Sequence, residues 1–230
     1  MILAGYTFSW SQYYGNEPIA VYNYFTQKGA KIGSTYLYNP ASAQSYVYNS
    51  SSRDGTSHEV HVGINRLLTA NITLAASIGV SYSANNNDPF NHNTDIAPTA
   101  NVSLSYNYQP GNYVQLGITQ SQNATDVVEP GINGSLTQYQ NTTVVYADIN
   151  HQIVHNLFAT VIGRYQYSTF QGGAANQDAD QQIDAGINLT YNFNRHFSAD
   201  LGYNFDDLMS QLVGRAFTEN RVYLGVTASY

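Results

Sequence analysis

The chain has 230 residues, of which 15 are acidic and eight are Lys or Arg, so its net charge is −7. Charged residues make up 10% of the sequence, against roughly 25% in ordinary soluble proteins. The acidic balance argues against nucleic acid as a partner, because phosphate binding needs basic residues. The sequence has no cysteine, which excludes disulfides and cysteine-based metal sites.

The first strand is predicted within residues 1–14, where two kinds of side chain alternate. Apolar residues take every second position and small polar residues the positions between: Ala4, Tyr6, Phe8 and Trp10 against Gly5, Thr7, Ser9 and Ser11. A period of two predicts a β-strand with one apolar and one polar face. The next segment, residues 15–55, is rich in Tyr, Asn and Ser. Its short β-prone runs predict a hairpin or two.

The rest of the chain repeats the alternation of the first strand. It predicts nine further strands, at residues 58–67, 72–83, 99–108, 113–123, 139–152, 157–169, 182–193, 197–205 and within 215–230. The connections also alternate in length. Short turns lie near 69–70, 110–111, 153–156 and 194–195, and longer polar loops at 15–55, 84–98, 124–138, 170–181 and 207–216. No window contains the ~20 consecutive apolar residues of a membrane helix.

Strands of about ten residues with short turns at one end and long loops at the other are typical of outer-membrane β-barrels. The fold class predicted is therefore all-β, an antiparallel up-and-down transmembrane barrel of about ten strands. Residues 1–230 would form a single domain, with an extracellular insertion at about 15–55. The localisation predicted is integral to the bacterial outer membrane. A secreted β-sandwich or adhesin is the alternative fold.

Aromatic side chains favour the barrel over the sandwich, because they sort into two belts, as amphipathic rings do at membrane interfaces. One predicted girdle lies toward the short turns: Tyr106, Tyr108, Tyr113, Tyr191, Phe193, Phe197 and Tyr230. The other lies toward the long loops: Trp10, Tyr82, Tyr165, Tyr167, Tyr203 and Phe205. A soluble sandwich has no physical reason to produce such belts.

Four runs of the sequence carry a family resemblance: 110–117 (PGNYVQLG), 122–126 (QNATD), 199–207 (ADLGYNFDD) and 220–230 (NRVYLGVTASY). They resemble the second β-barrel porin family of Gram-negative bacteria. The similarity covers roughly residues 56–230 and the first strand, but not the insertion. The resemblance implies a porin-like channel for small hydrophilic solutes. Members of the family are usually longer at the N-terminus, so both a complete ten-stranded barrel and the C-terminal part of a wider one stay open.

The final strand also resembles the closing strand of outer-membrane barrels. In those proteins, a polar residue, a glycine two positions later, a hydrophobic residue and a terminal aromatic form a signal for the barrel-assembly machinery. The matching positions are Tyr223, Gly225, Ala228 and Tyr230. The small Ala228, and Tyr in place of the commoner terminal Phe, depart mildly from the pattern. The resemblance implies the assembly machinery as a partner.

The strand assignment places eight ionisable residues on the polar face, which would line the lumen of a barrel: Glu59, His61, Asp148, Arg164, Asp184, Asp200, Asp206 and Arg221. One interpretation is a pore whose acidic surplus favours cations. The alternative is a non-conducting structural or surface-binding barrel. In it, Arg164 and Arg221 pair with carboxylates and side chains fill a narrow interior.

A third interpretation is a hydrolase at the extracellular mouth, because Asp with His can activate water. The acids and histidines available there are Asp206, Asp207, His58, Glu59, His92 and Asp95. No pair of them is fixed by spacing, and the sequence has neither an omptin-like motif nor a nucleophile elbow. The prediction is therefore no enzyme activity, no catalytic residue, no metal site and no cofactor.

The expected surroundings are outer-membrane lipid and lipopolysaccharide. External acids such as Asp126, Glu129 and Asp178 could bridge lipopolysaccharide phosphates through divalent cations. The sequence leaves open the solute and the oligomeric state.

Overall fold

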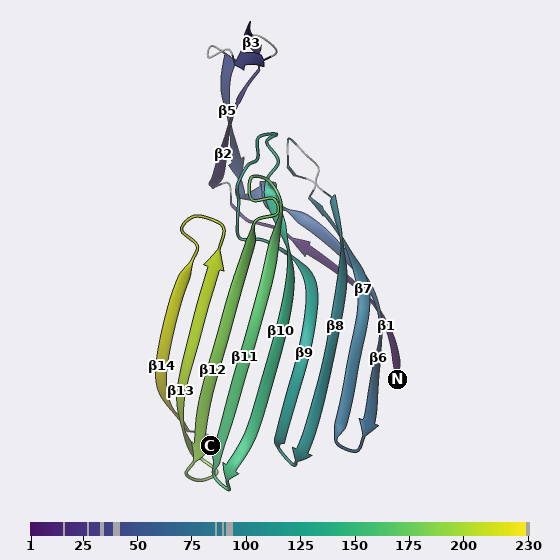
Figure 1. Cartoon of the computed structure of the whole chain (residues 1–230), viewed down its shortest axis with the longest axis vertical. Coiled ribbons are helices and arrows are strands. Elements are labelled where there is room, and N and C mark those ends of the chain that lie inside the picture. Colours follow the sequence, from purple (N-terminus) through teal and green to yellow (C-terminus); the bar gives the residue numbers. More distant parts are fainter. Residues whose placement is uncertain are drawn as a thin grey trace.

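The computed structural model describes residues 1–15, 17–26, 28–32, 35–38, 42–85, 87–88, 90 and 94–228. Ten strands form one antiparallel sheet in the order β1-β6-β7-β8-β9-β10-β11-β12-β13-β14 (Figure 1). Their bounds are β1 Ile2–Ser11, β6 Gly55–Thr69, β7 Ile72–Asn85, β8 Thr94–Gln109, β9 Asn112–Ala124, β10 Thr137–Val154, β11 Leu157–Gly172, β12 Ala179–Asn192, β13 Phe197–Ser210 and β14 Phe217–Ala228. β6 is hydrogen-bonded to β1, and each strand from β7 to β14 is hydrogen-bonded to the strand that precedes it in sequence. The all-β, antiparallel, up-and-down prediction is confirmed.

The observed strands match the predicted ones to within a few residues at the end with short turns, here called the turn end. At the opposite end, the loop end, they run further: β8 begins five residues before its predicted start and β13 ends five residues after its predicted end. The extra residues escape the alternation because outward positions there become polar, as at Thr94 on β8 and Asp207 on β13. Backbone pairing continues where the apolar band stops.

The cross-strand register gives the sheet two chemically different faces. The successive partners Val161, Ile187 and Tyr203 lie on one face, which we call the apolar face. The partners Thr160 and Asn188 lie on the other, the polar face. Side chains of the apolar face are largely exposed: Val222 is 72% and Leu224 77% exposed. Apolar side chains of this size rarely face water in so continuous an array.

The register also corrects one girdle residue. Tyr113 pairs with Asn107 and Asn150, which places it on the polar face and not in the aromatic belt. Tyr113 apart, the belt residues that have a cross-strand partner in this register lie on the apolar face.

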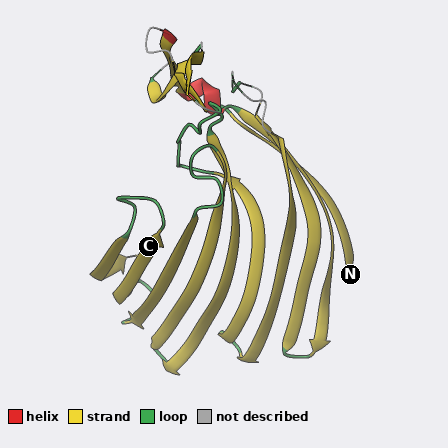
Figure 2. Ribbon diagram, turned by 45° about the horizontal axis from the view of Figure 1, so that its top comes forward, coloured by secondary structure: helices red, strands yellow, loops and turns green. Residues whose placement is uncertain are grey.

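The sheet is curved, with β1 at one edge and β14 at the other (Figures 1 and 2). Over the described residues it is not closed, because β1 pairs only with β6 and β14 only with β13. No helix of the described residues is long and apolar enough to cross a membrane.

Above the loop end stands a hairpin made of residues from the insertion (Figure 1). Strand β2 (Pro18–Phe25) pairs with β5 (Ala43–Asn49), and β3 (Lys28–Ile32) pairs with β4 (Thr35–Tyr38). A 3₁₀ turn, η2 (Ser50–Arg53), then leads into β6. Phe90, from the β7–β8 connection, is surrounded by rings of the hairpin with centroids 5.1 to 5.9 Å away: Tyr22, Tyr24, Tyr46 and Tyr48.

The other long connections pack against one another at the loop end. Val127, Phe170, Ala175 and Leu212 form a small apolar cluster between three loops. Arg215 crosses the cluster, with its guanidinium over the Phe170 ring at 5.7 Å. Its Nη1 donates to Asp126 at 2.8 Å and its Nε to Asp180 at 3.0 Å. The hydrogen bond from Arg215 holds the pKa of Asp126 below its ordinary value.

Candidate pore wall

Four charged residues form a row across the polar face. Arg164, Asp184, Asp206 and Glu219 are successive cross-strand partners on β11, β12, β13 and β14. The row exists because each of these strands keeps the same parity, so every second residue reaches the same side of the sheet. Hollows of about 410 and 380 Å³ lie along it, and Arg164 and Asp184 line both. The sequence placed three of these residues on one face, and the register brings them together.

The charges around this row are only partly compensated. Arg221 donates to Glu219 through Nη2 at 2.9 Å and Nε at 3.2 Å. Arg164 makes no ion pair within 4 Å with any part of the chain that the structure describes. Carboxylates therefore outnumber guanidiniums here: Asp148, Asp184, Asp206 and Glu219 against Arg164 and Arg221. In the non-conducting alternative, Arg164 and Arg221 would each pair with a carboxylate. Among the described residues, Arg221 has such a partner and Arg164 has none.

The other predicted wall residues lie apart from this row. Glu59 on β6 accepts a hydrogen bond from Thr99 at 3.1 Å, and His61 Nδ1 lies 3.7 Å from its carboxylate. Asp200, toward the turn end of β13, accepts a 2.6 Å hydrogen bond from Thr190. All eight predicted residues are on the polar face by register, but they form separate groups and no single ring.

Rings on the polar face lie flat against glycines of the neighbouring strand. Tyr146 is paired with Gly117 and Tyr223 with Gly202. A Cβ added to either glycine would overlap the ring of its partner. His61 covers Gly5 in the same way. A glycine opposite an aromatic residue lets the ring cover the bare backbone, so these large side chains follow the wall and do not project from it.

Sequence reasoning missed Glu219, which has the parity of Arg221 two residues later on the same strand. Period-two counting from Arg221 would have found it. It also missed Gln122, which accepts from Ser83 at 2.8 Å and donates to Asp95 at 2.6 Å. No sequence signal points to that bridge, because Gln122 lies on the outward parity of β9.

The candidate hydrolytic residues are distributed over both faces. His58 lies on the apolar face, where the Tyr6 hydroxyl is 2.8 Å from its Nδ1, whereas Glu59 lies on the polar face. Asp206 and Asp207 are separated in the same way. Asp95 is hydrogen-bonded to Gln122, and His92 lies outside the described residues.

The predicted assembly signal is described in part. Tyr223 and Gly225 are on the polar face of β14. Ala228 ends that strand on the apolar face, opposite Phe197. Tyr230 lies outside the described residues.

We compared the chain with known protein families, and one family matches it. The family model described as "Putative beta-barrel porin 2" matches residues 40–230. The chain belongs to this family. Neither the curated proteins nor the solved structures contain a match to the chain. The match to the β-barrel porin family confirms the predicted resemblance and includes nine of the ten sheet strands. Strand β1, which the sequence resemblance was expected to include, lies outside it.

Proposed function

We propose that this protein is an integral outer-membrane barrel that acts as a porin-like channel for passive diffusion of small hydrophilic solutes or ions. The observation that carries the proposal is the ten-stranded sheet with one continuous apolar face and one hollowed polar face. An apolar outer face suits lipid, and a polar inner face suits a water-filled path. The absence of enzyme activity is part of the proposal.

The charges on the polar face support a preference for cations. The carboxylate surplus around Asp184 and Asp206 sits beside open hollows. Carboxylates that line a pore raise the local concentration of cations and lower that of anions.

The test is conductance of refolded protein in a planar bilayer with a KCl gradient. Discrete current steps with a cation-selective reversal potential are expected. Asp184→Lys and Asp200→Lys should each move that potential toward anion selectivity. Asp207→Lys is the matched control, because it changes the charge equally on the apolar face of β13 and should leave the potential nearly unchanged.

A non-conducting structural or surface-binding barrel is the second candidate. It is favoured by the packing of the loops at the loop end, where Arg215 joins Asp126 and Asp180 over a buried Phe170. Correctly folded protein that inserts into the bilayer without any current would select this candidate over the channel.

A further inference from the structure

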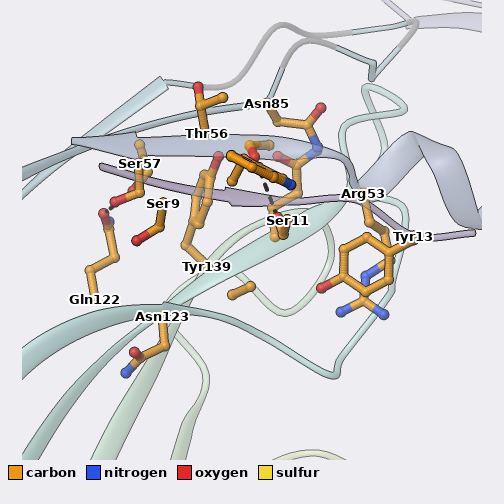
Figure 3. Close-up of a pocket in the computed structure, with 15 residues that line it drawn as sticks. Ser9, Ser11, Tyr13, Arg53, Thr56, Ser57, Asn85, Gln122, Asn123 and Tyr139 are labelled. Atoms are coloured by element: carbon orange, nitrogen blue, oxygen red, sulfur yellow. Dashed lines mark hydrogen bonds between the residues drawn. The ribbon is translucent and has the colours of Figure 1, made fainter. Parts of the chain in front are cut away.

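A cavity of about 220 Å³ lies at the loop end, where the sheet splits (Figure 3). The pairing of β8 with β9 stops at Ala100 and Gln120. Beyond that point, residues of β1, β6 and β7 line one side of the cavity and residues of β9 and β10 the other. Gln122 spans the split through its hydrogen bonds to Ser83 and Asp95, so the walls of the cavity are held in place without a ligand.

Neutral hydrogen-bonding groups dominate the lining of this cavity. They include the hydroxyls and amides labelled in Figure 3: Ser9, Ser11, Thr56, Ser57, Asn85 and Asn123. Among the described residues that line it, Arg53 alone carries a charge. Its guanidinium already stacks 4.4 Å above the Tyr13 ring and donates to the Thr125 carbonyl oxygen. The cavity therefore differs from the charged row on β11 to β14.

Two polar atoms of the wall have no hydrogen-bond partner within the described structure. The Tyr139 hydroxyl has none, and neither has the Oε1 atom of Gln138. Gln138 is only 7% exposed, and its Nε2 is engaged by Asp88 at 3.3 Å. Figure 3 shows Tyr139 rising from β10 toward the strand that carries Thr56 and Ser57. Buried polar groups normally have a partner, so an acceptor and a hydroxyl without one point to a ligand that brings hydroxyls of its own.

We propose that this cavity is a binding site for a small neutral carbohydrate. Sugar hydroxyls both donate and accept, which matches the Ser, Thr, Asn and Gln side chains of the lining. The Tyr139 ring offers an apolar surface to the C–H face of a sugar ring. The described lining residues include no carboxylate, so a cationic solute would lose hydration without meeting a counter-charge. The inference deepens the proposed function, on which it rests: a solute that enters the channel from the loop end would meet this site before the charged row.

Saturation-transfer NMR on the refolded protein in detergent micelles tests the site. D-glucose and protonated D-glucosamine are the probes, because they share a ring and differ in charge. Glucose should receive saturation, and glucosamine, measured at about pH 6 where it is a cation, at least several-fold less. Tyr139→Phe should reduce the glucose signal at least three-fold, and folding should tolerate it because that hydroxyl makes no internal hydrogen bond. Tyr146→Phe, on the polar face outside the cavity, is the control and should keep the signal.

Equal signals from the two sugars, no signal from glucose, or an unchanged signal in Tyr139→Phe would each overturn the site. Bilayer conductance is measured on the same preparations to separate the two proposals. A channel that conducts but gives no glucose signal removes the carbohydrate site alone. Glucose binding without conductance removes the channel and keeps the site.

Discussion

Single residues decide how much room the polar face leaves. Tyr146 and Tyr223 are large enough to obstruct a narrow interior, yet each ring lies over a glycine of the adjacent strand. The alternation in sequence predicts which face Gly117 and Gly202 occupy. It does not predict their cross-strand partners, because the register between strands sets those. The function of these glycines is therefore visible only once the strands are paired.

Gly117→Ala should lower the conductance of the proposed channel. The new methyl group takes the place of the Tyr146 ring, which must rotate away from the wall into the path. Overpacking of this kind costs about 1–3 kcal/mol of stability where the ring cannot move freely. Single-channel recording in planar bilayers measures the conductance, and urea titration measures the free energy of unfolding.

Two variants make the Gly117→Ala experiment specific. Gly163→Ala is the control, because Gly163 lies on the apolar face and, its two chain neighbours apart, no atom lies within 4 Å of an added Cβ. The double variant Gly117→Ala with Tyr146→Ala should recover the conductance, since the displaced ring is gone. A single variant that conducts like the unmodified protein would show that the ring does not narrow the path.

Strands were the most predictable elements of this chain, because each alternates over enough residues to show a period of two. Their extensions at the loop end were not, since the outward face becomes polar there and the signal fades. The split between β8 and β9 was also hidden. It depends on contacts such as Ser83 with Gln122, which are 39 residues apart. The charged candidates were placed on the correct face, but their grouping required the register.

Leu201→Arg should impair membrane insertion by roughly 2–4 kcal/mol, the cost of a cation on the lipid face near the bilayer midplane. Leu201 pairs with Leu189 and Leu224 on the apolar face. Asn188→Arg is the control, because Asn188 is next to Leu189, the partner of Leu201, but lies on the polar face and lines a hollow. Urea-dependent folding into liposomes gives both free energies. Equal losses in the two variants would mean that the apolar face is not the lipid face.

The whole sheet has two edges that no described strand covers. Strands β1 and β14 each present a row of backbone N–H and C=O groups on one side. In water such edges can be hydrated, but in the hydrocarbon core each unsatisfied group costs several kcal/mol, which is why sheets span membranes only as closed barrels. The register is set within the ten paired strands, whereas closure depends on which strand meets each edge.

In lipid, the amides of β1 and β14 should exchange with deuterium as slowly as those of central strand β11, because both edges must be paired there. Hydrogen exchange of the protein in its own membrane measures this, with the hairpin strands β2 and β5 as the fast-exchanging control. Rapid exchange of the amides at both edges, β1 and β14, would contradict a closed barrel.

The intact mass from that membrane then shows whether strands of a longer chain are available to pair with the two edges. A mass near 25.3 kDa leaves β1 and β14 to pair with each other or with a second copy. The two cases are separable by cysteine crosslinking, since the chain has no cysteine of its own. A clearly larger mass means that further strands of a longer chain complete a wider barrel.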